Sequence, residues 1–205
     1  SVFDKKIIGG LISHEDGRLN PIKLMNLFME KIDKMKINKI NMNVINIKKN
    51  IHIGNKNWEL CLENNESIYQ DFIVICSALN TQKILKTLGH KILLEPILGQ
   101  VIELELENKT KHWNQWPAIV NFNSINFIHQ DPLHLLMGAT IEPGLKPSEL
   151  NKQKMLTMNN TAPKWIQKAK IRHQWNGLRA KPLHEAAPLL KELEPGLFIN
   201  TGHYR

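Results

Sequence analysis

Cysteine and long apolar runs are scarce in this sequence. Only Cys61 and Cys76 occur among its 205 residues. Both lie in apolar, strand-like segments at no metal-binding spacing, so they predict neither a disulfide framework nor a zinc site. We expect both to be buried free thiols in a reducing compartment. No apolar run reaches the roughly 18 residues that cross a bilayer, and no signal-peptide pattern opens the chain. These absences predict a cytoplasmic protein that binds no membrane.

Several signatures of catalysis and metal binding are also missing. The sequence has no GxSxG elbow, no GxxxxGK[ST] phosphate loop and no HExxH helix, which removes the common hydrolase, nucleotide-triphosphatase and zinc-protease patterns. Nine histidines are present. The nearest pair, His129 and His134, flanks a predicted turn without a cysteine or carboxylate cluster to complete a metal shell. We therefore predict no metal site.

The charge balance is basic but dispersed. The formal net charge is +8, and 42% of the residues are hydrophobic, which is enough to build a core. The lysines alternate with asparagine and isoleucine over most of the length, and no stripe of Lys and Arg with interleaved aromatic residues occurs. A solvated basic surface is the expectation, and nucleic acid is not an expected partner.

The first half of the chain predicts a mixture of helix and strand. A helix is expected over residues 20–35, because Asn20 is a good N-cap, Pro21 suits the first turn, and apolar residues recur at helical spacing on a face directed at a core. Short strands separated by Asn and Gly turns follow over residues 39–70, including one near residues 51–53. The apolar run over residues 72–78 predicts a strand buried on both faces, as in a parallel sheet, and the helix over residues 80–88 ends at Gly89.

From residue 95 the pattern becomes antiparallel. Alternating strands are expected before and after the turn at Asp131–Pro132, and helices are expected over residues 149–158 and 163–170. A strand over residues 171–180, a proline-punctuated loop over residues 182–195 and a final strand over residues 196–202 complete the chain. The predicted fold class is α/β (α+β), with a doubly wound part and a mostly antiparallel sheet with flanking helices.

Two arginines stand at the ends of predicted strands. Arg179 follows Gly177, and Arg205 follows a Gly-His-Tyr turn. Each can be a rim residue paired with a surface carboxylate. Alternatively, the two guanidinium groups converge on one anionic group, for which their bidentate geometry suits a carboxylate.

At these residues the sequence resembles the D-amino-acid oxidase family of FAD-dependent oxidoreductases, and most of all its glycine oxidase branch. Six segments resemble family motifs in the family's order: EDGRLNP, DFIVICSALNTQKIL, LEPILGQVIELE, HLLMGATIEPG, WNGLRA and LFINTGHYR. In the family, a GxGxxG strand-turn-helix that binds the FAD pyrophosphate precedes the first of these segments, and a glycine and a helix follow the last. The resemblance therefore implies an internal segment of a longer chain. Residues 1–93 and 196–205 would form part of the FAD-binding domain, and residues 94–195 would form the substrate-binding domain.

The resemblance also implies an activity, a cofactor and a set of site residues. A small amino acid or amine would lose a hydride to FAD, the resulting imine would hydrolyse, and oxygen would reoxidise the flavin. Arg179 would bind the substrate carboxylate and Arg205 would lie by the substrate, while Ile141 and the residue at Asn126 would line the substrate pocket. Cofactor contacts would come from Val44, Ser77, Ala78, Gly202 and His203. No side chain is assigned as an acid or base, and 205 residues without the pyrophosphate loop are not expected to hold FAD tightly or to be active alone.

Departures from the family pattern leave alternatives open. Ala180 stands in place of the family's proline after the arginine, Asn80 in place of a tryptophan, and Asn126, or Phe127 with a one-residue shift, in place of a tyrosine that shares the carboxylate. One alternative is a degenerate, non-catalytic binding member of the family. Another is a flavin-dependent tRNA-modification enzyme, which the +8 charge permits. The substrate, the electron acceptor and the oligomeric state are left open.

Overall fold

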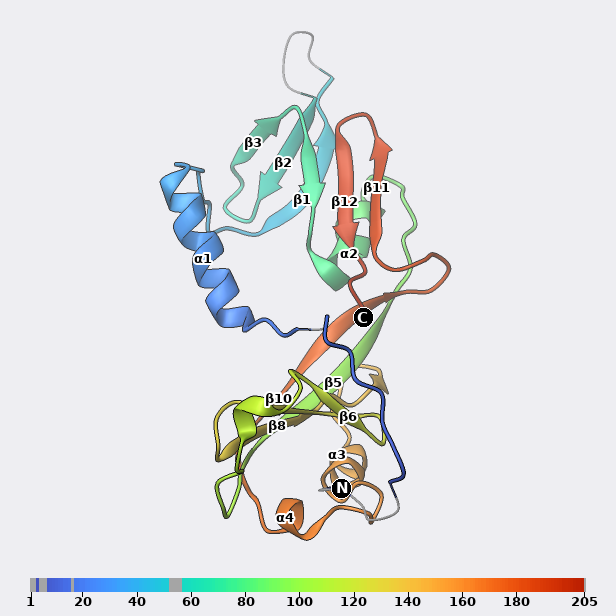
Figure 1. Ribbon diagram of the computed structural model, residues 1–205. Coiled ribbons are helices and arrows are strands. Elements are labelled where there is room, and N and C mark those ends of the chain that lie inside the picture. The colour runs from blue at the N-terminus through green and yellow to red at the C-terminus, as the bar shows by residue number, and fades with distance from the viewer. Residues whose placement is uncertain (1–2, 4–6, 16, 52–56, 205) are drawn as a thin grey trace. The chain divides into compact units, whose positions relative to one another are not determined.

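The computed structural model describes residues 3, 7–15, 17–51 and 57–204 (Figure 1). The chain divides into two compact units. Unit 1 comprises Ser1–Ile37, Leu98–Glu142 and Lys146–Gly177, and unit 2 comprises Asn38–Ile97, Pro143–Leu145 and Leu178–Arg205. Two long strands, β5 (Leu94–Glu105) and β10 (Lys170–Pro182), contribute residues to both units. No helix of the described residues is long and apolar enough to span a membrane.

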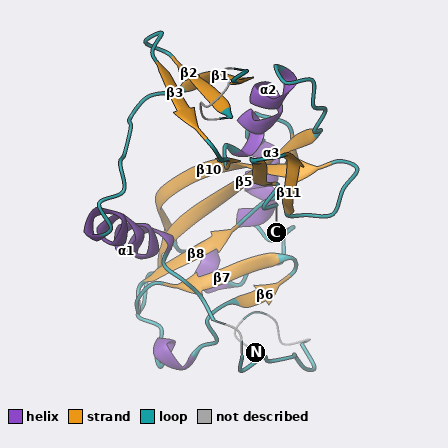
Figure 2. Ribbon diagram, turned by 90° about the horizontal axis from the view of Figure 1, so that it is seen from above, coloured by secondary structure: helices purple, strands orange, loops and turns teal. Residues whose placement is uncertain are grey.

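The main element of unit 1 is an antiparallel sheet. Its strands run in the order β10-β5-β8-β7-β6, where β6 is Val120–Phe122, β7 is Ile125–His129 and β8 is His134–Gly138, and the short strand β9 (Glu142–Pro143) also pairs with β5. Strands β5, β8 and β7 lie side by side in Figure 2. Phe127 pairs with Met137 across β7 and β8, and both are almost fully buried because alternate residues of each strand face the core.

Two short helices contribute to the same core. Helix α3 (Glu149–Leu156) begins at Ser148, whose hydroxyl accepts a hydrogen bond from the Asn151 amide, and it contributes the buried Met155. Helix α4 (Lys164–Gln167) contributes Ile166. A single 3-10 turn, η2 (Trp113–Gln115), lies in the connection between β5 and β6. The core of unit 1 is thus built from one face of the sheet and from α3 and α4.

Unit 2 contains two three-stranded sheets. Strands β1 (Val44–Lys49), β2 (Trp58–Leu62) and β3 (Ser67–Gln70) form an antiparallel meander. The other sheet has the order β11-β12-β4, with β4 at Ile73–Ile75, β11 at Leu189–Glu194 and β12 at Leu197–Thr201, and β12 pairs with β4 in parallel. A 3-10 turn, η1 (Ala78–Asn80), and helix α2 (Thr81–Lys86) follow β4. The buried Trp58 joins the two sheets, because its indole donates to the Pro195 carbonyl at 3.3 Å.

Helix α1 (Pro21–Lys34) has the predicted start but not the predicted packing. The Asn20 side chain accepts a hydrogen bond from the Lys23 amide, as expected of an N-cap. None of the helix residues is buried, and the apolar side chains at Leu27 and Phe28 are more than half exposed. Helix propensity and the Asn20 cap are therefore sufficient to form this helix. Nothing among the described residues covers its apolar face.

The mixed α+β fold class is confirmed, and so are most of the predicted elements. The strand at residues 72–78 was predicted to be buried on both faces, and this is wrong: only Ile73 and Ile75 of β4 are buried, and Val74 is 59% exposed. The burial expected for the cysteines is also wrong, since Cys61 is half-buried and Cys76 is exposed. The loop predicted over residues 182–195 is wrong in part, because residues 189–194 form β11. This strand pairs with β12 despite the flanking prolines. The strand expected near residues 51–53 falls mostly outside the described residues.

Candidate cofactor and substrate site

A cavity of about 580 Å³ lies in unit 2 between β1, β4 and the start of α2. It brings together Val44 and Ser77, which are 33 positions apart in the sequence and were both predicted to contact a cofactor. Its apolar walls are Val44, Ile45, Ile47, Leu60, Ile73, Val74, Ile75 and Ile84. Its volume falls within the range of ligand pockets in proteins, and its lining combines these apolar side chains with polar ones from Asn43, Glu63, Ser77, Asn80 and Lys83.

The polar groups of this cavity carry both signs of charge. The Glu63 carboxylate accepts hydrogen bonds from the Asn43 side chain at 2.7 Å and from the Asn43 amide at 3.2 Å. The side-chain bond and then the backbone bond hold the Glu63 pKa below its ordinary value, so the group is an anion at neutral pH. Lys83, on α2, supplies a cation, and Ser77 and Asn80 supply neutral polar groups.

Hydroxyl groups tie the turn after β4 to the end of β12. Thr81 Oγ1 lies 3.1 Å from Ser77 Oγ and 3.4 Å from Thr201 Oγ1, and the Thr201 hydroxyl donates to the Ala78 carbonyl at 3.2 Å. Thr81 and Thr201 are almost fully buried. The structure therefore brings the predicted cofactor residues Ser77 and Ala78 against the strand end that leads into Gly202.

Gly202 has a structural reason to be glycine. Its φ is +74°, a left-handed conformation that side chains disfavour, and a Cβ at this position would lie 2.7 Å from Cγ of Pro182. The next residue, His203, is exposed and its Nε2 lies 2.5 Å from Oδ1 of Asn200. Arg205, predicted to bind substrate, lies outside the described residues.

Arg179 lies on β10 within unit 2. It is half-buried and stands between Leu178, which is 43% exposed, and Ala180, which is buried in the core of unit 2. Two positions on, Lys181 pairs with Glu95 at 3.1 Å, and its ammonium lies 6.0 Å from the centre of the Tyr204 ring. Arg179 is thus held on a packed strand, as a binding residue must be, and Tyr204 lies close to the same strand.

The two residues predicted to line the substrate pocket, Ile141 and Asn126, lie in unit 1. Ile141 is 65% exposed and follows the strand end at Gly138. Asn126 pairs with Gly138 across β7 and β8, and its Oδ1 accepts from the Asn121 side chain at 2.8 Å. Arg179 belongs to unit 2, so these three residues do not form a site within one unit.

A buried carboxylate next to Ile141 was not predicted. Glu142 is 3% exposed, and Oε1 accepts hydrogen bonds from the Thr140 hydroxyl and from Gln100 Nε2, the latter at 2.8 Å. Oε2 accepts from the Ser148 amide at 2.8 Å. Burial alone raises the Glu142 pKa, but the bonds from Thr140, Gln100, Ser148 and Asn151 outweigh burial and hold the pKa below its ordinary value.

This network joins three chain segments around the exposed Ile141. Gln100 comes from β5, Thr140 and Glu142 flank Ile141, and Ser148 caps α3. Gln100 also donates to the Ser148 carbonyl at 2.9 Å, and its amide donates to the Thr140 hydroxyl at 2.9 Å. Gln100, Thr140 and Glu142 are the polar residues of the segments LGQ and GATIE, so they could have been selected from the sequence. Their mutual contact depends on strand pairing.

Comparison with known protein families identifies the class of this chain. Residues 2–205 match the family model described as FAD dependent oxidoreductase, the DAO family. The chain belongs to this family, and the predicted family resemblance is confirmed. FAD is the cofactor of the family. A search of curated protein sequences found no match.

Solved structures of amino-acid oxidases and dehydrogenases share this fold. Glycine oxidase from Geobacillus kaustophilus aligns with a TM-score of 0.65 and 20% identity over 80% of this chain and 43% of its own. Iminodiacetate oxidase from Chelativorans sp. BNC1 aligns with a TM-score of 0.69 and 20% identity over 88% of this chain and 48% of its own. L-proline dehydrogenase from P. horikoshii aligns with a TM-score of 0.71 and 15% identity over 90% of this chain and 50% of its own. The chain thus spans about half the length of these relatives, and at such identities the likeness establishes the fold.

The unit 2 cavity fits the nucleoside end of FAD. A flat base suits the apolar walls, and the polar groups at Glu63, Ser77 and Asn80 can hydrogen-bond to a sugar or a base. Asn46 Oδ1 on β1 is buried without a hydrogen-bond partner among the described residues, but Asn46 does not line this cavity. The 205 residues contain no GxGxxG motif for the pyrophosphate.

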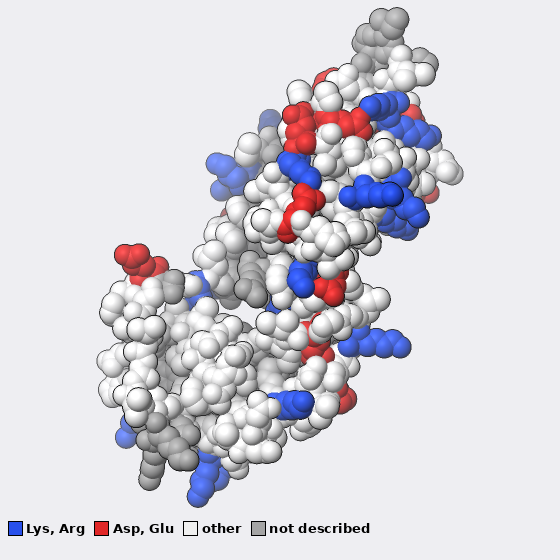
Figure 3. All heavy atoms as spheres, turned by 90° about the vertical axis from the view of Figure 1, so that its right-hand side faces the viewer, with Lys and Arg blue, Asp and Glu red and all other residues white. Residues whose placement is uncertain are grey.

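Basic and acidic groups are mixed on one side of the described surface. On the side that Figure 3 shows, Lys and Arg groups are interleaved with Asp and Glu. Ion pairs such as Lys168–Glu107 at 3.0 Å and Lys152–Glu149 at 2.6 Å illustrate this neutralisation in unit 1. On the face shown, the basic groups are therefore dispersed among acidic ones.

Proposed function

We propose that this chain forms part of an FAD-dependent oxidoreductase that oxidises a small amino acid or amine, with oxygen as the acceptor. When bound, FAD supplies the hydride acceptor for such a reaction. The observation that carries the proposal is the cavity that Val44 and Ser77 share, because the family resemblance assigns both residues to the cofactor and the structure brings them to one cavity of ligand size. The relatives whose names include glycine, iminodiacetate and L-proline support the substrate class.

In this proposal Arg179 anchors the substrate. Its planar guanidinium can donate two parallel hydrogen bonds to a carboxylate, which orients the substrate as well as binding it. The half-buried position on β10 supports this role, because a guanidinium partly shielded from water forms stronger charge-assisted bonds than one in bulk solvent. Arg205 is proposed as a second donor to the same carboxylate.

The residues of unit 1 have a positioning role in the proposal. Ile141 presents an exposed apolar side chain, and the hydrogen bonds at Thr140 and Glu142 fix the backbone on both sides of it. Asn126, or Phe127 with a one-residue shift, stands where the family has a phenol that binds the substrate carboxylate. We therefore propose that the substrate is an amine or a hydroxy acid other than glycine.

The test uses the complete gene product. We expect the purified protein to show a flavin absorption spectrum and to release peroxide with at least one substrate in a panel of small amino acids, N-methyl amino acids and hydroxy acids. Arg179→Ala should lower kcat/KM by about ten- to a hundredfold, since a charge-assisted hydrogen bond is worth roughly 1.5–3 kcal/mol. The matched control is Arg172→Ala, which removes an arginine from the same strand whose guanidinium instead contacts His134 at 2.8 Å.

The outcomes separate this proposal from its alternatives. Bound flavin with no turnover across the panel would favour a non-catalytic binding member of the family. Retention on RNA that falls steeply with salt would favour a tRNA-modification enzyme. An equal loss of kcat/KM in the Arg179 and Arg172 variants would contradict the proposal that Arg179 anchors the substrate.

A further inference from the structure

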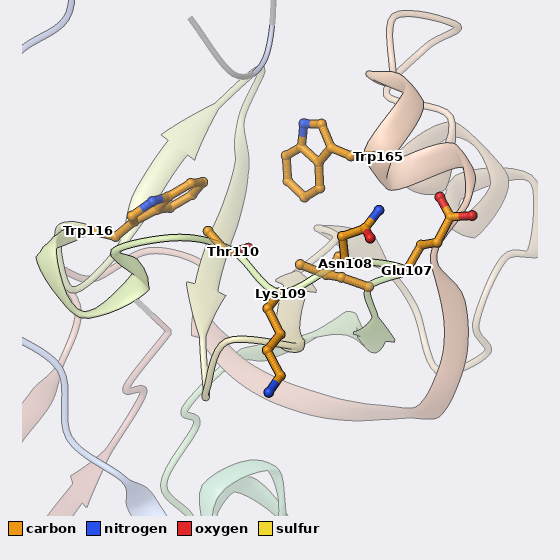
Figure 4. Close-up of a pocket in the computed structure, with 7 residues that line it drawn as sticks. Glu107, Asn108, Lys109, Thr110, Trp116 and Trp165 are labelled. Atoms are coloured by element: carbon orange, nitrogen blue, oxygen red, sulfur yellow. The ribbon is translucent and has the colours of Figure 1, made fainter.

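A second cavity lies in unit 1, between the end of β5 and α4. Its volume is about 220 Å³, and it is lined by Leu106, Glu107, Asn108, Lys109, Thr110, Trp116 and Trp165. Figure 4 shows the indoles of Trp116 and Trp165 on opposite sides of Thr110, with the Lys109 side chain extending away from both rings. All the lining residues belong to unit 1, so this cavity is separate from the cofactor cavity of unit 2.

Both indoles are held in place by other rings. The Trp116 ring packs edge-on against the His129 ring, with centroids 4.6 Å apart, and the Trp165 ring packs against Phe3, with centroids 5.7 Å apart. The segment between them is also anchored, because the amides of Leu106 and Thr110 donate to the carbonyls of Leu133 and Pro132, each at 2.8 Å. A cavity with fixed walls loses little entropy when it binds a ligand.

The size and the walls of the cavity suit one aromatic ring. A cavity of about 150 Å³ with apolar walls is sufficient to hold a benzene molecule, and this cavity is larger. Two indoles offer edges and faces for ring contacts, each worth roughly 0.5–1.5 kcal/mol beyond the burial of area. The remaining volume accommodates one small substituent near Asn108, Lys109 and Thr110.

The charges at the rim decide the sign of that substituent. The Glu107 carboxylate is paired with the Lys168 ammonium at 3.0 Å and is therefore neutralised. Lys109 lines the cavity and has no carboxylate partner among the described residues. Its side chain extends away from the rings in Figure 4, and rotation about its flexible four-carbon stem would bring the ammonium to the rim. The unbalanced charge of the cavity is positive, and we propose that it binds a small planar aromatic compound that carries one anionic group.

Three probes of matched shape test this proposal on the full chain. Benzenesulfonate carries the ring and the anion, methyl phenyl sulfone has a similar shape without the charge, and phenyltrimethylammonium carries the opposite charge. Binding is followed through the indole N–H signals of the tryptophans in NMR spectra, with Trp116→Phe and Trp165→Phe used to assign two of them. We expect benzenesulfonate to shift those two signals saturably with a Kd of about 1 mM. The sulfone should bind severalfold more weakly, and the cation should not bind.

Lys109→Met and Lys111→Met form the decisive pair. Both remove one charge from an exposed lysine, but only Lys109 lines the cavity. Lys109→Met should raise the Kd of benzenesulfonate about threefold, the effect expected of one solvent-exposed charge. Added salt should reduce the difference in Kd between this variant and the wild type. Lys111→Met should leave the Kd unchanged and serves as the control for folding and net charge.

Three results would overturn the proposal. The first is the absence of a saturable shift at the Trp116 and Trp165 signals. The second is an equal loss of affinity in the two lysine variants, which would indicate attraction by net charge alone. The third is tighter binding of the cation, which would mean that Glu107 rather than Lys109 sets the preference.

Discussion

Replacing Glu142 by glutamine would test the buried network around Ile141 with almost no change in volume. The carboxylate accepts on both oxygens: Gln100 and Thr140 donate to one, and the Ser148 amide donates to the other. An amide has only one acceptor oxygen. If the NH2 group takes the Oε2 position it faces the Ser148 amide and one hydrogen bond is lost; if it takes the Oε1 position it faces Thr140 and Gln100 and two are lost.

The magnitude follows from these contacts. A hydrogen bond to a charged group contributes roughly 1.5–3 kcal/mol, and a buried donor left without a partner costs about 1–3 kcal/mol. Removing a buried charge recovers part of its desolvation cost. We therefore expect Glu142→Gln to lower the free energy of unfolding by about 2–4 kcal/mol.

Urea denaturation followed by circular dichroism measures this loss. The matched control is Glu107→Gln, whose carboxylate pairs with Lys168 and where both side chains are more than half exposed, and it should cost well under 1 kcal/mol because surface pairs contribute little. The Glu142 pKa is lowered by folding, so the stabilisation is complete above pH 4.5, the ordinary pKa, and is lost as pH falls below it. A loss below 1 kcal/mol at neutral pH, or a difference between wild type and variant that persists at low pH, would refute the reasoning.

Three further predictions concern other residues. Burial, with a smaller contribution from Arg18, lowers the His129 pKa, although bonds at Asp131 and His134 oppose the shift. The free energy of unfolding should therefore decline as pH falls below 6.5, the ordinary pKa. His129→Gln should remove this pH dependence and His203→Gln should not, as measured by denaturation across pH. Gly202→Ala should lower the free energy of unfolding by about 2–4 kcal/mol, because it combines a positive φ with a close contact to Pro182, whereas Gly177→Ala, with open space and no positive φ, should cost under about 1 kcal/mol. The 205-residue chain purified alone should show no stoichiometric flavin spectrum, since it contains no GxGxxG motif; a yellow protein with equimolar FAD would contradict this.

The local elements were largely predictable, because their signals are local. Asn20 and Ser148 cap helices through bonds to residues three positions on, and the alternation in residues 94–105 matches a strand with one buried face. The failures are nonlocal. An apolar run cannot reveal whether both of its faces are covered, so the exposure of Val74 and of the apolar face of α1 was not predicted.

The candidate site shows the same division. The motif residues Val44, Ser77 and Arg179 could be named because their order along the chain resembles that of a family. Their proximity could not, because Val44 and Ser77 meet only through the packing of β1 against β4 and α2. The two-tryptophan cavity had no signal in the sequence, since Trp116 and Trp165 are 49 positions apart.

The sequence by itself thus determined the order of helices and strands, the positions of the caps and turns, and the family motifs, since each depends on residues within a few positions of one another. The tertiary structure alone decided which polar groups are buried and which cavities form. The carboxylate of Glu142 became a buried anion because β5 and α3 deliver Gln100 and Ser148 to its two oxygens. The cost of burying a charge depends on donors that only the folded chain brings within reach.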